Sequence, residues 1–108
     1  MGLHKDTFEI LVALAEGERH GYAILQDIAA RTDGKVKLSP STLYSAIRRL
    51  LEEGWIEELD ERPSDNNDER RRYYRLTAEG RKVAVTEAKR LERLLADARA
   101  AGLLRRHP

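Results

Sequence analysis

The most informative part of the chain is SPSTLYSAIRRLLEE, Ser39 to Glu53. Gly54 follows it directly, and then comes Trp55-Ile56-Glu57-Glu58-Leu59. Ser39 is placed to cap a helix because its side-chain oxygen can accept a hydrogen bond from a backbone N–H of the first turn. Pro40 suits the first helical position, and Gly54 supplies the left-handed residue that commonly ends a helix. An alternating pattern that is typical of a strand begins at Trp55. We therefore expect a helix over residues 39–53 that leads directly into a β-hairpin.

The predicted helix has two different faces. Its core side carries apolar residues at helical spacing, Leu43, Ala46, Ile47 and Leu50. Its opposite side carries Ser41, Ser45, Arg48 and Glu52. Small hydroxyls near the start of a helix, with arginines one or two turns later, suit a helix end that enters a DNA groove. An ordinary solvated helix face can have the same composition.

Two further helices are expected before this one. Asp6 and Glu9 fit a capping box, and an apolar stripe follows as far as Gly17. A second helix is expected over Arg19 to Arg31, followed by the turn residues 32–35.

The hairpin is read from a change to a period of two. Its strands are expected around residues 55–60 and 70–76, joined by a polar tip over residues 62–68. Tyr74 and Leu76 should face the core, which sends Arg71, Tyr73 and Arg75 outward. The run Arg70 to Arg72 favours contact with phosphate groups, although a solvated arginine face is the alternative.

Thr77 is expected to cap a long last helix that continues to about Leu104. An apolar seam runs along it, Ala84, Ala88, Leu91, Leu94, Leu95 and Ala98. The first half of this helix can pack on the rest of the domain. For the second half we expect a partner helix from another copy of the chain.

The predicted fold is therefore mainly α with a small β-hairpin, a winged helix-turn-helix with three helices, a two-stranded wing and a long C-terminal helix. We expect residues 1–76 to form a DNA-binding domain and residues 77–108 to form a dimerisation helix continuous with it.

Composition narrows the class of protein. The chain has 108 residues, of which 41% are apolar and 36% charged, so one domain with a modest core is expected. It has no cysteine and a net charge of only +1. Without an apolar run of membrane-spanning length or a signal peptide, we expect a cytoplasmic protein. The three histidines are scattered, and Asp65, Asp68 and Glu69 lack the framework of a calcium loop. We expect no enzyme activity, cofactor or metal.

The chain as a whole resembles the PadR family of transcriptional regulators, in the short form with one helix after the wing. The resemblance covers nearly the whole chain and is carried by three motifs: Gly21-Tyr22-Ala23-Ile24, Ser39 to Tyr44 followed by Ile47 and by Leu50 to Ile56, and Tyr73-Tyr74-Arg75-Leu76-Thr77-Ala78-Glu79-Gly80-Arg81. One departure is the acidic wing tip, which puts insertion of the tip into the minor groove in doubt.

The resemblance implies a homodimer that binds double-stranded DNA, usually as a repressor, and that often releases DNA when a small hydrophobic or aromatic effector binds. From the motifs and the resemblance together, the candidate DNA-binding residues are His20, Tyr22, Ser39, Ser41, Thr42, Tyr44, Ser45, Arg48, Arg71 and Arg72. Trp55 is a candidate for the effector site, with a core position as the alternative. A winged helix that binds only other proteins is the competing function, and the near-neutral net charge supports it.

Overall fold

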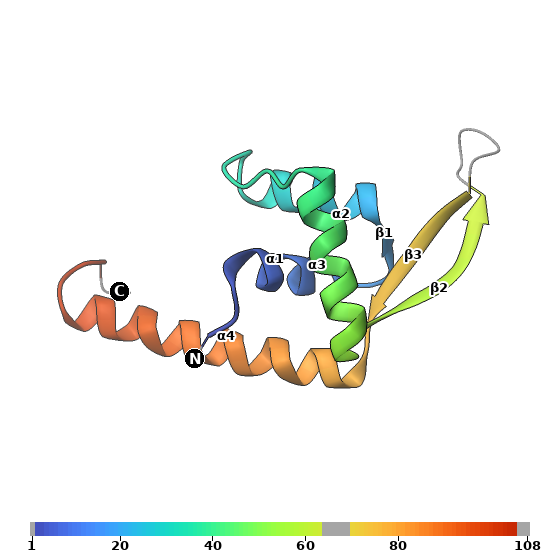
Figure 1. Ribbon diagram of the computed structural model, residues 1–108. Coiled ribbons are helices and arrows are strands. Elements are labelled where there is room, and N and C mark those ends of the chain that lie inside the picture. The colour runs from blue at the N-terminus through green and yellow to red at the C-terminus, as the bar shows by residue number, and fades with distance from the viewer. Residues whose placement is uncertain (1, 64–69, 106–108) are drawn as a thin grey trace.

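The structure is a computed structural model that describes residues 2–63 and 70–105, with side chains for all of these except residues 60–63, 70 and 71. Over these residues the elements follow in the order α1 (Lys5–Ala15), β1 (Arg19–His20), α2 (Gly21–Arg31), α3 (Pro40–Glu53), β2 (Ile56–Pro63), β3 (Arg70–Leu76) and α4 (Ala78–Ala100). Figure 1 shows α1, α2 and α3 gathered between the β2–β3 hairpin and the long α4. The predicted winged-helix architecture is confirmed.

Both predicted ends of α3 are confirmed. The Ser39 side-chain oxygen accepts a hydrogen bond from the backbone N–H of Thr42 at 3.1 Å, and Pro40 is the first helical residue. Gly54 ends the helix in the left-handed conformation with φ 77°. The predicted core side of the helix is buried and its predicted outer side is exposed.

The first two helices begin differently from the prediction. The cap of α1 is His4, whose Nδ1 accepts the backbone N–H of Asp6 at 3.1 Å, so the expected capping box of Asp6 and Glu9 is wrong. Asp6 instead lies in the first turn, where the positive end of the helix dipole favours a carboxylate. The second helix starts at Gly21 and not at Arg19.

Arg19 and His20 form a strand that the sequence did not predict. Strand β1 pairs antiparallel with β3, with Arg19 opposite Tyr74 and His20 opposite Tyr73. Among the described residues the sheet therefore has three strands in the order β1-β3-β2, where a two-stranded wing was expected. The wing hairpin is thus tied to the start of α2.

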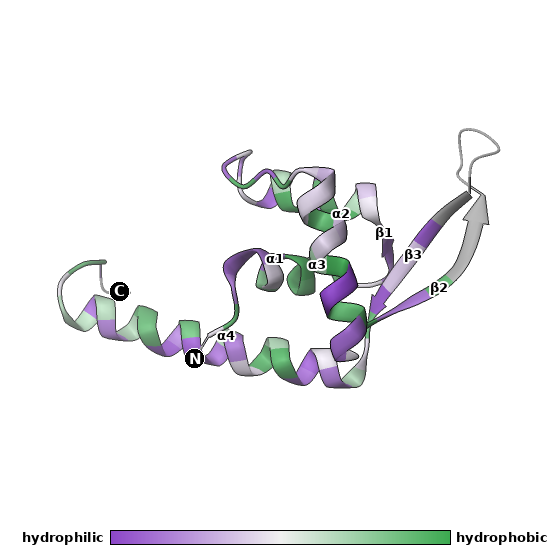
Figure 2. Cartoon of the chain, viewed as in Figure 1, coloured by the Kyte–Doolittle hydropathy of each residue, from purple (hydrophilic) through white to green (hydrophobic). Residues whose placement is uncertain are grey.

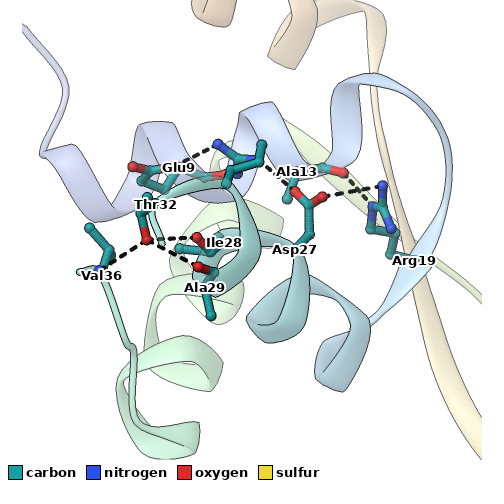
Figure 3. A network of polar contacts seen from close by, with 9 residues as sticks. Glu9, Ala13, Arg19, Asp27, Ile28, Ala29, Thr32 and Val36 are labelled. Atoms are coloured by element: carbon teal, nitrogen blue, oxygen red, sulfur yellow. Dashed lines mark hydrogen bonds and ion pairs between the residues drawn. The ribbon is translucent and has the colours of Figure 1, made fainter. Parts of the chain in front are cut away.

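A network of polar contacts fixes α1, β1 and α2 to one another (Figure 3). The Arg19 guanidinium donates from Nε to the Ala13 carbonyl at 2.7 Å and lies 3.6 Å from the Asp27 carboxylate. Arg31 donates to Asp27 at 2.8 Å and to Glu9 at 2.9 Å. The position of α2, and hence of the turn that leads to α3, is set by these contacts.

The core lies where the helices meet the base of the hairpin. It is made of residues from α1, α2, α3 and the two long strands: Ile10, Leu11, Ala13, Leu14, Ile24, Ile28, Leu43, Ala46, Ile47, Leu50, Ile56 and Tyr74. In the hairpin, Ile56 lies opposite Leu76 and Glu58 opposite Tyr74, with an irregularity between Leu59 and Arg62. Tyr74 is buried and Leu76 packs against the core, whereas Arg75 is exposed, which confirms the predicted register. Asp65, Asp68 and Glu69 lie outside the described residues.

Helix α4 starts as predicted and ends earlier. The Thr77 side-chain oxygen accepts the backbone N–H of Gly80 at 3.0 Å and its hydroxyl donates to the Gly54 carbonyl at 2.7 Å. Gly80 is buried against the backbone of Trp55, whose carbonyl oxygen would collide with a Cβ at this position. The helix ends at Ala100, before Gly102 with φ 83°, and does not reach Leu104. In the described part of the chain, no helix is long and apolar enough to cross a membrane.

Candidate nucleic-acid interface

The first turn of α3 presents a cluster of exposed hydroxyl groups. The Ser39 hydroxyl oxygen lies 2.9 Å from that of Thr42 and 3.3 Å from that of Ser41, and all three side chains are exposed. A hydroxyl can donate one hydrogen bond and accept two, so these groups keep capacity for an external partner. Ser45 and Arg48 follow on the exposed side of the same helix. The predicted face is therefore continuous and open to solvent.

Tyr44 leans from α3 onto the start of α2. Its side chain is 47% exposed, and a Cβ at Gly21 would lie 2.5 Å from its hydroxyl oxygen. The glycine therefore makes room for the tyrosine, a contact that the sequence did not reveal. Tyr22, the next residue of α2, is 57% exposed. Tyr44 thus adds aromatic surface one turn after the hydroxyl cluster, and Tyr22 exposes a second ring at the start of α2.

His20 has a defined structural role. Its Nδ1 accepts the backbone N–H of Ala23 at 3.1 Å and so caps α2, and its ring meets that of Tyr73 edge to face with centroids 5.4 Å apart. The predicted site residue therefore joins the sheet to α2. Its place next to Tyr22 brings it to the same end of α2 as the contact between Tyr44 and Gly21.

The described side chains of the wing pair basic with acidic residues. Arg72 lies 3.7 Å from Glu58, and Arg75 forms an ion pair with Glu57. Burial raises the pKa of the Tyr74 hydroxyl, and the neighbouring Glu58 carboxylate raises it further. The backbone of Arg71 lies opposite that of Arg62 in the register of the two strands, but its side chain is not among those described. Glu58 and Glu57 are residues of this surface that sequence reasoning missed.

Trp55 lies half-buried between two surface cavities and packs against the core. One cavity, of about 340 Å³, is formed with Leu3 and residues 79–87 of α4, and the other, also about 340 Å³, with Leu3 and the C-terminal part of α3. The indole is therefore a shared wall rather than a fully enclosed core residue. Trp55 is therefore accessible from both cavities.

The residues of the predicted dimer seam differ in how far they are buried within their own chain. Ala84 packs against the core of its own chain, and Leu91 and Ala98 are half-buried. Leu94 is 56% exposed, Leu95 is 43% exposed, and Ala88 is exposed as well. Figure 2 shows apolar bands that continue along the part of α4 that extends beyond the other helices. An apolar face thus remains on the second half of α4.

The charged side chains of the described residues do not gather into a cluster of three or more His, Cys, Asp or Glu that could hold a metal ion.

Comparison with known proteins identifies the family directly. Residues 10–85 match the transcriptional regulator PadR-like family. The chain belongs to this family. The PadR-like family consists of transcriptional regulators rather than enzymes.

Three relatives illustrate the match. An uncharacterized protein X of Lysinibacillus sphaericus is 36% identical over 78 residues, which cover 72% of this chain and 69% of that protein. A transcriptional regulator from Clostridium thermocellum has 32% identity and a TM-score of 0.72, over 87% of this chain and 86% of that one. Bacillus subtilis PadR, in its crystal structure with operator DNA, shares the fold at 20% identity with a TM-score of 0.65, over 97% of this chain and 51% of that one.

Proposed function

We propose that this PadR-like regulator is a homodimeric repressor that binds a palindromic operator through α3. The observation that carries the proposal is the exposed polar face at the start of α3. The wing adds an exposed positive charge, the Arg72 guanidinium. Bacillus subtilis PadR, which shares this fold, binds operator DNA in its crystal structure, and this supports the proposal.

The chemistry of this face suits the major groove. The hydroxyls of Ser39, Ser41, Thr42 and Ser45 can contact base edges or phosphates, and Arg48 can donate two hydrogen bonds to guanine. We assign Arg72 and Arg71 of the wing to phosphate contacts, which fix the register of the protein on the duplex. Tyr44, with Tyr22 and His20 beside it, would meet the DNA at the start of α2.

Helix α4 would join two copies of the chain. Leu94 and Leu95 are exposed apolar side chains on a helix that extends past its own domain, and pairing them about a two-fold axis would remove them from water. Each copy would then present α3 to one half-site, with the two half-sites about 34 Å apart, one turn of DNA.

We further propose that a small hydrophobic or aromatic effector binds at Trp55 and changes the angle between the two α4 helices. The cavity shared by Trp55, Leu3 and α4 supports this location, because a ligand there would touch the helix that joins the protomers. Aromatic compounds that bind should quench Trp55 fluorescence and weaken DNA binding together. Compounds that bind tightly at Trp55 and leave DNA affinity unchanged would contradict this mechanism.

The pairing of wing arginines with glutamates, together with the net charge of +1, supports a second function, a winged helix that binds only proteins. Selection of bound duplexes from a random DNA pool by the purified protein separates the two. The repressor proposal predicts enrichment of a palindrome. Recovery of no preferred sequence at moderate salt, with binding of a protein through the wing, would favour the second function.

A further inference from the structure

The ion pair between Arg72 and Glu58 lies on the face of the hairpin that carries Tyr74 and packs against the helices. Glu58 is the register partner of Tyr74, and cross-strand partners point to the same face of a sheet. Arg72 is two residues from Tyr74 and shares that face as well. Since Tyr74 is 3% exposed and belongs to the core formed with the helices, the pair sits at the edge of the contact between helices and wing.

Tyr44 connects this pair to the proposed reading face. The electrostatic influence of Tyr44 contributes to the raised pKa of Tyr74, as does a hydrogen bond between Tyr74 and Glu58, so the three groups are neighbours. The charge of Arg72 also acts on Tyr74, so the exposed guanidinium lies near the place where α3 and the wing meet and is open to a phosphate from solvent. Glu57 and Arg75 occupy the alternate positions of the same strands and face the other side.

The pair is weak enough to exchange. Its charged atoms are 3.7 Å apart, and the side chains of Arg72 and Glu58 are 63% and 41% exposed. Ion pairs between exposed groups of this kind contribute little because water and salt screen them. A phosphate that approaches Arg72 can replace the carboxylate, but the carboxylate then remains close to the phosphate and repels it.

We propose that Glu58 sets the affinity for DNA by neutralising Arg72, so that binding requires the guanidinium to exchange Glu58 for a phosphate. This inference rests on the proposed function of the chain as a DNA-binding regulator. Glu58 is then an affinity-determining residue that acts through Arg72 and contacts no base. Its effect should be about equal for operator and random duplex, because a phosphate contact carries no sequence information.

The test compares Glu58→Gln with Glu57→Gln. Glutamine keeps the size of the side chain and can still accept the hydrogen bond from Tyr74, so the fold should be preserved, and thermal unfolding checks this. Both variants remove one negative charge from β2, but only Glu58 pairs with Arg72, whereas Glu57 pairs with Arg75 on the other face. We expect Glu58→Gln to bind random duplex and operator about 2- to 5-fold more tightly per protomer at low salt, with a salt dependence steeper by about one counterion. Glu57→Gln should gain clearly less.

A double-mutant cycle shows whether the effect passes through Arg72. In the Arg72→Gln background, the gain from Glu58→Gln should fall to that of Glu57→Gln. An equal gain with and without Arg72 would mean that Glu58 acts only as a distant charge and would overturn the proposal. Weaker binding by Glu58→Gln would also overturn it, because Glu58 would then hold Arg72 in its binding position.

The proposed function is tested separately by the unmodified protein. If it prefers a palindromic site while Glu58→Gln and Glu57→Gln behave alike, the role of Glu58 is wrong and the repressor proposal stands. If the unmodified protein prefers no site but binds random duplex, the repressor proposal fails, and the gain of Glu58→Gln over Glu57→Gln on random duplex still decides the role of Glu58.

Discussion

At the scale of single residues, the contact between Gly21 and Tyr44 links the start of α2 to the proposed reading helix. A Cβ at Gly21 would meet the hydroxyl and ring carbons of Tyr44, which form the far end of a side chain that can rotate away. The backbone of α2 need not move. A substitution here should therefore change where Tyr44 points more than it changes stability.

We predict that Gly21→Ala lowers DNA affinity by about 1 kcal/mol, the lower end of the range for a lost contact, and leaves the free energy of unfolding within about 0.5 kcal/mol of the original. Titration of a labelled operator and urea unfolding measure the two effects. Gly17→Ala is the matched control, because nothing lies within 4 Å of a Cβ at that position. Unchanged DNA affinity in Gly21→Ala would show that the orientation of Tyr44 does not matter for binding.

At the scale of elements, the ends of α3 and the start of α4 were predictable because their signals are local. Ser39, Gly54 and Thr77 act through hydrogen bonds or backbone angles within a few residues, and the sequence carries those directly. Strand β1 was not predictable, since Arg19 and His20 are too few to show a period and their partners lie in β3. His4 was missed as a cap because Asp6 offered a stronger local signal.

The candidate site likewise has features that local sequence signals predict and features that depend on tertiary contacts. The exposed face of α3 follows from helical spacing around its buried residues, and the structure bears out which side chains are exposed. The pairing of Arg72 with Glu58 depends on the strand register, and the approach of Tyr44 to Gly21 depends on how α2 and α3 pack. Neither can be read from spacing along one element.

Helix α4 also holds the N-terminal segment through a buried carboxylate. Glu87 is 5% exposed and accepts hydrogen bonds from Arg90 at 2.9 and 2.7 Å, and from the backbone of Leu3. The Arg90 guanidinium lowers the pKa of Glu87, with a further contribution from the Leu3 backbone. Leu3 lines both cavities beside Trp55, so this carboxylate fixes one wall of the proposed effector site.

We predict an acid-dependent loss of this stabilisation. Because the pKa of Glu87 is lower in the folded protein than its unfolded value of about 4.3, the contribution is fully present above that pH and is lost as the pH falls through the folded value. Urea unfolding should show Glu87→Gln less stable than the original protein at neutral pH, by a difference that shrinks under acid conditions. Glu92→Gln, at an exposed position of the same helix, is the control. A difference that stays constant on acidification would contradict the assignment.

For the whole molecule, the extension of α4 beyond its own domain is the feature that supports the proposed dimer. The molecule measures 54 × 28 × 24 Å, and Figure 1 shows α4 spanning its long direction. Leu94 and Leu95 are exposed on that extension. Exposing this apolar surface to water costs free energy, and burial between two copies of the chain would remove that cost.

We predict that replacing Leu91 and Leu95 by Glu converts the dimer to monomers, because four carboxylates would then meet at a buried two-fold seam. Sedimentation at micromolar concentration measures the change. Ala96→Glu introduces a charge at an exposed position of the same helix, outside the seam, and should leave the dimer intact. A monomeric unmodified protein under these conditions would refute assembly through α4.

We propose that the start of α3 reads bases, and the variant Thr42→Ala provides the sharpest test. Binding curves for this variant and the original protein are measured on an enriched palindrome and on versions with each base pair changed in turn. We predict that Thr42→Ala loses discrimination between base pairs at particular positions of each half-site, by about 1–3 kcal/mol for a good base contact, and keeps it elsewhere. An equal loss of affinity on every sequence, or no preference for the palindrome by the original protein, would contradict it.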